Sequence, residues 1–239
     1  MKKKPSLPSF ANVVVALSLG CVAAAASAQD AKPGDAVAGQ KKAAMCNGCH
    51  SIQGYQASFP EVYKVPKIAG QNEKYIAAAL TEYRKGDRKH PTMRAIAASL
   101  TDQDIADIAA FYSRLGMEGA ATAAAPAASA AAPALEPSAQ VAKLLAQANC
   151  ASCHGANFNA PIDPSYPKLA GQYADYLYAA LKAYQTGQNP HVGRNNAIMS
   201  GMAKPYSHAD LKLIANYLAD LPGDVKTVPE ASFRATTQF

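Results

Sequence analysis

Two pentapeptides of the form Cys-x-x-Cys-His contain the residues of this chain that are best suited to chemistry. They are Cys46-Asn47-Gly48-Cys49-His50 and Cys150-Ala151-Ser152-Cys153-His154. In such a motif the two thiols can form thioethers to the vinyl groups of a haem, and the adjacent imidazole is placed to bind the iron. The pair of motifs therefore predicts two covalently bound haem c groups, with His50 and His154 as axial ligands of the two irons.

Other uses of a Cys-x-x-Cys pair need a different setting. A thioredoxin-like redox pair follows a strand in a βαβ unit, and a zinc ribbon places its second cysteine pair 15 to 20 residues after the first. Neither setting is found in this sequence. The chain has five cysteines, four of which belong to the two motifs, and the fifth is Cys21.

The first 28 residues have the pattern of a signal peptide. Lys2, Lys3 and Lys4 precede an apolar run, and an Ala-Ser-Ala site ends at Ala28. We expect cleavage after Ala28, which would remove Cys21. A lipoprotein that uses Cys21 and an uncleaved membrane anchor are the alternatives, but the residues before Cys21 form a poor lipobox and the apolar run is short and rich in alanine.

The rest of the chain is a duplication. Residues 66–71 recur as residues 167–172, with the sequences Pro-Lys-Ile-Ala-Gly-Gln and Pro-Lys-Leu-Ala-Gly-Gln. We divide the chain into a first domain at 29–118, a linker at 119–137 rich in alanine and proline, a second domain at 138–222 and a tail at 223–239. The linker has too few large apolar residues to contribute to a core.

Both copies have helical signals. Thr101 and Ser207 are each followed three residues later by an aspartate, a capping pattern that predicts helix starts. Apolar residues then recur at helical spacing up to Leu115 and Leu221. Because no convincing alternating strand is present, we predict an all-α fold of two tandem domains, each with three to four short helices around a haem.

The residue on the other side of each iron decides between ligand binding and electron transfer. Met93 and Met199 each lie eight residues before the capping residue of their copy, whereas Met202 aligns with the apolar Ile96 and is interpreted as packing. We therefore predict Met93 and Met199 as the second axial ligands. His90, His191 and His208 are rival ligands, but they do not recur at matching positions in the repeat.

The charge of the chain does not indicate a nucleic-acid partner. The formal net charge is +6, and three of the positive charges belong to the predicted signal peptide. Basic residues of the first copy could form a docking ring for an acidic redox partner, although a solvated helical face explains them as well. The residues of this ring are Lys41, Lys42, Lys85, Arg88 and Lys89.

Taken together, the motifs, the repeated Pro-Lys-x-Ala-Gly-Gln blocks and the methionines make the chain resemble dihaem cytochromes c of the cytochrome c4 type over residues 33 to 222. The resemblance implies a class I cytochrome c fold in each half. It also implies that the carbonyls of Pro66 and Pro167 accept a hydrogen bond from the proximal histidines. The linker exceeds the family's usual connection and the tail has no counterpart in the first copy, which leaves the packing of the halves open.

The resemblance further implies a periplasmic electron carrier of a respiratory chain, loosely associated with the membrane. Its redox partners would be a donor such as a quinol:cytochrome c oxidoreductase and, as acceptor, a terminal oxidase. One alternative is an electron-accepting subunit of a dehydrogenase or reductase complex. A dihaem peroxidase is a further alternative, but it would need one haem that can open, and two matched methionines argue against it.

Overall fold

The computed structural model describes residues 32–117, 135–187 and 189–230. The predicted signal peptide at 1–28, with Cys21, lies outside these residues, and so do most of the linker and the end of the tail. Within the three described ranges, none of the helices is both long and apolar enough to traverse a lipid bilayer.

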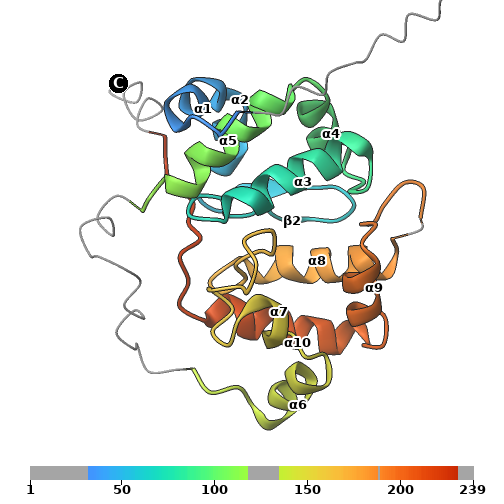
Figure 1. Cartoon of the computed structure of the whole chain (residues 1–239). Helices are drawn as coiled ribbons and strands as arrows, with labels where there is room; N and C mark the ends of the chain where they lie inside the picture. The colour runs from blue at the N-terminus through green and yellow to red at the C-terminus, as the bar shows by residue number, and fades with distance from the viewer. Residues whose placement is uncertain (1–31, 118–134, 188, 231–239) are drawn as a thin grey trace, which may run out of the picture. The chain divides into compact units, whose positions relative to one another are not determined.

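The described residues of the first half form five helices and one small hairpin (Figure 1). The hairpin pairs two antiparallel strands of two residues each, which the sequence analysis did not foresee because so short a strand has no alternating pattern. The elements in order are α1 Ala36–Lys42, α2 Ala44–His50, β1 Gln56–Ala57, β2 Tyr63–Lys64, α3 Glu73–Lys85, α4 Pro91–Ala98 and α5 Asp102–Arg114.

The part of the second half that the structure describes also has five helices but no hairpin. In both halves the last helix packs against the first helix and against the long middle helix of the same half. The all-α prediction of two tandem domains is therefore confirmed, although the described part of each half has five helices and not the three to four that were predicted. The helices are α6 Ala139–Gln147, α7 Ala151–His154, α8 Ala174–Gln185, α9 Ala197–Ala203 and α10 His208–Asp220.

The last helix of each half begins at the predicted residue. The Thr101 hydroxyl accepts a hydrogen bond from the Asp104 amide, and the Asp104 carboxylate accepts one from the Thr101 amide. Ser207 and Asp210 form the same reciprocal pair at the start of α10. Such a reciprocal pair is called a capping box. It satisfies backbone donors that have no partner inside the helix, so the local sequence determines where the helix starts.

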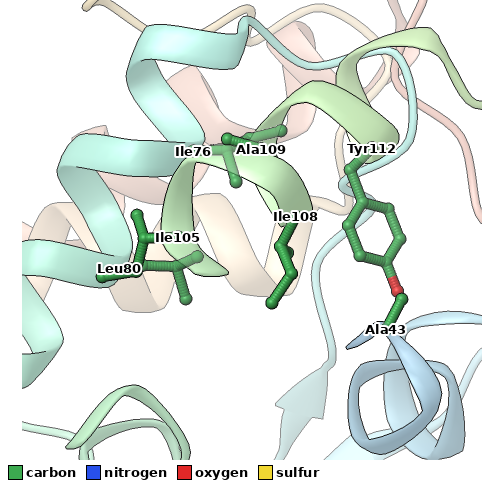
Figure 2. Close-up of a cluster of buried hydrophobic side chains, with 7 residues drawn as sticks. All are labelled: Ala43, Ile76, Leu80, Ile105, Ile108, Ala109 and Tyr112. Carbon is green, nitrogen blue, oxygen red and sulfur yellow. The ribbon is translucent and has the colours of Figure 1, made fainter. Parts of the chain in front are cut away.

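Each half has its own apolar core. The first contains Ile105 and Tyr112 of α5, and Figure 2 shows Ile105 beside Leu80 of α3 and Tyr112 beside Ala43. The second core is built by residues from α6, α8 and α10 together with Phe158 and Ala170. The two clusters explain why the apolar positions of the repeat recur at helical spacing.

The two halves pack against each other, which settles the question that the sequence left open. Arg88 and Arg194 form an antiparallel backbone bridge. Ion pairs also join the halves, and in one of them Lys64 Nζ lies 3.2 Å from Asp175 Oδ2. A second pair joins Lys182 to Glu61 at 2.5 Å.

The start of the tail returns to the first half. Asp224 pairs with Lys168 of the second half at 3.0 Å. Two residues later, Lys226 forms an antiparallel backbone bridge with Ala69 of the first half. The described tail therefore contacts both copies of the repeated Pro-Lys-x-Ala-Gly-Gln block.

Candidate haem-binding sites

The cysteines of each motif lie on one short stretch of helix. Cys46 and Cys49 belong to α2, and Cys153 belongs to α7, whose N-cap is Cys150 in helical conformation. All four are half-buried and free of disulfide bonds. Burial raises the pKa of the Cys46 and Cys150 thiols. This helical placement puts the two thiols of a motif about one turn apart, as attachment to one porphyrin edge requires.

Both motif histidines are oriented by a proline carbonyl. His50 Nδ1 lies 2.9 Å from the Pro66 oxygen, and His154 Nδ1 lies 3.1 Å from the Pro167 oxygen. A carbonyl can only accept, so each Nδ1 carries the proton and each Nε2 keeps its lone pair for a metal. Burial lowers the pKa of both histidines, which favours the neutral imidazole that binds iron. The donor set therefore fits a haem c in each half.

The two candidate methionines occupy equivalent places near helix starts. The Met93 amide donates to Nδ1 of His90, the N-cap of α4, at 3.3 Å. The Met199 amide donates to Oδ1 of Asn196, the N-cap of α9, at 3.0 Å. Met93 also packs against the core cluster that Cys46 contacts. The caps give both methionines the same local backbone, although the residues that provide them differ.

The rival ligands have other surroundings. His90 caps α4 with the ring nitrogen that would otherwise be available to iron, and His191 and His208 are exposed. Met202, which the sequence analysis interpreted as packing, is instead 44% exposed. Met199, three residues earlier on α9, is half-buried.

A buried polar network is found at the first motif. The Asn47 Oδ1 accepts hydrogen bonds from the Tyr112 hydroxyl at 2.8 Å and from the Ser51 hydroxyl at 3.2 Å. Its Nδ2 donates to Glu230 of the tail at 2.9 Å. In the second copy the residue after the first cysteine is Ala151, which has no side chain able to do this. The two sites therefore differ in polarity on the attachment helix.

The burial of two arginines was not predicted from the sequence, in which Arg88 was interpreted only as a member of the docking ring. Arg88 and Arg194 are 5% and 9% exposed and line a cavity of about 290 Å³ to which both halves contribute. Each guanidinium lies over the tyrosines of its own half, Tyr75 and Tyr83 for Arg88 and Tyr176 and Tyr184 for Arg194. The repeat could have revealed them, because the two arginines are separated by the same offset as the two capped helices.

Three of the five basic residues suggested as a docking ring are engaged in contacts within the protein. Arg88 is buried, Lys42 pairs with Asp104 and Asp107, and Lys89 donates to backbone carbonyls of the second half. These three residues of the proposed ring therefore hold the fold together. Their charges were visible in the sequence, but their partners lie far away along the chain.

Comparisons with known proteins agree with this geometry. The sequence profile of the cytochrome c family matches residues 36–115 and again residues 138–222. Cytochrome c4 of Azotobacter vinelandii is 31% identical over 218 residues, which cover 87% of this chain and 97% of that protein. A thiosulfate dehydrogenase electron acceptor of Stutzerimonas stutzeri is 29% identical and covers 87% of this chain and 92% of its own length. The crystal structure of reduced recombinant cytochrome c4 from Pseudomonas stutzeri superimposes with a TM-score of 0.57 at 28% identity, over 79% of this chain and all of that one.

Two helical domains, each with a haem attachment motif, define a tandem-domain c-type cytochrome. The chain belongs to the cytochrome c family and, within it, to the cytochrome c4 group. It binds two covalently attached haem c groups, and it is an electron carrier rather than an enzyme. The resemblance stated from the sequence is thereby confirmed.

Proposed function

We propose that the protein is a periplasmic carrier that accepts electrons from a quinol:cytochrome c oxidoreductase and passes them toward a terminal oxidase. The observation that carries the proposal is the repeated site, in which a proline carbonyl orients the motif histidine and a capped helix holds a methionine. A closed site of this kind leaves no position for a substrate. The similarity to cytochrome c4 proteins supports the respiratory role.

In this proposal the four cysteines of the motifs hold the two haems, and the axial pairs are His50 with Met93 and His154 with Met199. When bound, each haem supplies an iron that takes up and releases one electron. The chain's own contribution is rigidity: the Pro66 and Pro167 carbonyls hold the imidazole rings, and the caps of α4 and α9 hold the methionine backbones. Retained ligands keep structural change during electron transfer small.

The buried arginines supply the positive charge that such a cofactor needs. Within the described residues, Arg88 pairs with Glu82, whereas no carboxylate forms an ion pair with Arg194. A buried charge is costly without a counter-charge, and the carboxylates of a haem provide one. We propose that the cavity shared by the halves receives haem carboxylates beside these two guanidinium groups.

A redox titration of the purified holoprotein, followed by optical spectroscopy, tests the proposed function. We expect two haems per chain, both low-spin with His/Met ligation, and no peroxide turnover. Fewer than two haems, or a high-spin site that binds carbon monoxide readily, would contradict the proposal. Peroxide turnover would instead favour the peroxidase alternative.

The second candidate is the electron acceptor of a dehydrogenase. It is favoured by the similarity to a thiosulfate dehydrogenase electron acceptor along nearly the whole of both chains. Reduction of the holoprotein by a purified thiosulfate dehydrogenase with its substrate, faster than by a quinol:cytochrome c oxidoreductase, would support this candidate. The reverse order of rates would support the respiratory carrier.

A further inference from the structure

A buried glutamine of each half holds a peptide group of the other half. The Gln172 Oε1 accepts a hydrogen bond from the Lys67 amide at 2.9 Å, and Gln172 Nε2 donates to the Lys67 carbonyl at 2.8 Å. Gln172 is 4% exposed, and it belongs to the second half whereas Lys67 belongs to the first. Both polar atoms of this side chain therefore bond to the other half, and Oε1 also accepts from the Tyr173 amide of its own half at 3.0 Å.

The same contact occurs in the opposite direction. The Gln71 Oε1 accepts from the Lys168 amide at 2.9 Å, and Gln71 Nε2 donates to the Lys168 carbonyl at 3.0 Å. Gln71 is also 4% exposed. Both glutamines end the Pro-Lys-x-Ala-Gly-Gln blocks of the repeat, so the two blocks bind each other reciprocally. We call the two glutamines and their four bonds the glutamine clasp.

The clasp acts on the peptide groups that orient the motif histidines. The Lys67 N–H and the Pro66 C=O belong to one peptide group, and the Pro66 oxygen accepts the hydrogen bond of His50 Nδ1 at 2.9 Å. Gln172 thus accepts from the N–H of the peptide group whose C=O accepts from His50. Gln71 has the same relation to His154 through the peptide that joins Pro167 and Lys168.

We propose that each glutamine of the clasp is a positioning residue for the axial histidine of the opposite half and lowers the reduction potential of that half's haem. The inference depends on the proposed ligation of iron by His50 and His154. It adds that each half of the repeat influences the reduction potential of the haem in the other half. Gln172 acts on the first haem, and Gln71 acts on the second.

The physical reason is the cooperativity of hydrogen bonds through a peptide group. When the N–H of a peptide group donates to an acceptor, the negative charge on the carbonyl oxygen of the same group increases. That oxygen then accepts a stronger hydrogen bond. A stronger bond from Nδ1–H to that oxygen makes the imidazole a more basic ligand. A more basic ligand stabilises ferric more than ferrous iron, so the reduction potential falls.

Contacts other than the clasp also join the halves, which allows its removal to be tested without separating them. The Lys64–Asp175 and Glu61–Lys182 ion pairs lie between the halves, and so does the Arg88–Arg194 backbone bridge. None of these bonds involves the peptide groups that carry the Pro66 and Pro167 carbonyls. A substitution of one glutamine therefore tests its effect on the reduction potential while other contacts still hold the two halves together.

The test uses the full-length holoprotein with both haems and the variants Gln172→Leu and Gln71→Leu. Each variant is titrated by optical spectroscopy, and NMR follows the Nδ1 protons of the two axial histidines. We expect Gln172→Leu to raise the potential of the first haem and to shift the His50 proton upfield, with much smaller changes at the second haem. Gln71→Leu should have the converse effect.

Two further variants serve as controls. Gln172→Glu keeps an oxygen that can accept from the Lys67 amide, so the potential of the first haem should not rise. Asp175→Asn weakens an ion pair between the halves without touching the clasp, and it should shift neither histidine proton. A rise of the first potential in Gln172→Glu equal to that in Gln172→Leu would overturn the proposal.

Equal shifts at both haems in either leucine variant, or no shift at either, would also overturn it. These results presuppose a wild-type protein with two His/Met-ligated haems. If the wild type lacked them, the proposed function would fail, whereas correct ligation without crossed shifts would contradict the clasp proposal alone.

Discussion

At the scale of single residues, the two halves differ where the attachment helices meet the rest of the fold. Asn47 is 7% exposed and connects Tyr112, Ser51 and Glu230 by hydrogen bonds. In the second copy Ala151 takes the place of Asn47. A buried amide that satisfies several partners restricts the helix to one position, whereas alanine contributes only its methyl group. The first attachment helix is therefore held by more polar contacts than the second.

The choice between Met199 and Met202 can be tested at the same scale. We expect Met199→Ala to open the second haem to external ligands and to lower its potential, because thioether ligation favours the reduced iron. Met202→Ala should leave the spectrum nearly unchanged, since Met202 is 44% exposed on α9. Optical spectra with and without carbon monoxide provide the measurement. The opposite outcome for the two variants would show that the repeat misassigns the ligand.

At the scale of elements, N-cap residues determine where the helices that carry the proposed methionine ligands begin. His90 and Asn196 have different side chains, but both accept a hydrogen bond from the amide of the methionine three residues later. A cap fixes the first turn of a helix, which is where Met93 and Met199 are found. Different residues at the two N-caps thus give the two methionines, the proposed ligands, the same local backbone.

The capping box of α5 should make stability depend on pH. Hydrogen bonds from Lys42 and Thr101 hold the pKa of Asp104 at about 2, below its ordinary value of 3.8. A lowered pKa means that the carboxylate stabilises the fold fully above about pH 4 and loses this effect as the pH falls toward 2. We expect Asp104→Asn to lower the free energy of unfolding by about 0.5–1 kcal/mol at pH 7, a small value because the ion pair is partly exposed.

Denaturant unfolding of the holoprotein at pH 7 and near pH 2 measures this difference, which should be much smaller at the lower pH. Asp210→Asn is the matched control, because it changes the same position in the box of α10, where no ion pair joins a described lysine to the carboxylate. A loss for Asp104→Asn that persisted near pH 2, or that did not exceed the loss for Asp210→Asn, would contradict the role of Lys42.

At the scale of the whole molecule, the tail and the repeated blocks hold the two halves together. Gly70 and Gly171 are equivalent residues of the two blocks, with φ values of +77° and +73°. Their surroundings differ, since a Cβ on Gly70 would lie 2.7 Å from the Asp224 carbonyl oxygen of the tail, whereas one on Gly171 would have only ordinary contacts at 3.4 Å. The tail thus makes the first block the more crowded of the two.

Alanine at these glycines separates the effect of the tail from that of the backbone. Gly171→Ala should lower the free energy of unfolding by about 1–2 kcal/mol, the cost of a left-handed conformation for a residue with a Cβ. Gly70→Ala has the same cost and in addition pushes the tail away, so we expect a loss greater by about 1 kcal/mol or more. Thermal unfolding of the two holoproteins provides the comparison, and equal losses would show that the tail adds nothing.

Much of the fold and of the site was predictable because the signals are local. The attachment motifs, the repeat and the capping boxes at Thr101 and Ser207 depend on residues that are close in sequence, so their spacing is sufficient to predict two haems and two similar helical domains. The hairpin of β1 and β2 is too short to leave a pattern. Arg88 was interpreted as a surface charge because nothing near it in sequence reveals that it is buried.

The sequence by itself determined the chemistry of each half, since the cysteines, the histidine and the helix signals of a site all lie within one copy. The tertiary structure alone decided how the halves are joined. Gln71 and Gln172 are separated from their partners by about a hundred residues, and Asp224 lies beyond the last helix. Pairings over such distances have no periodicity or spacing in the sequence, because they depend on the packing of complete domains.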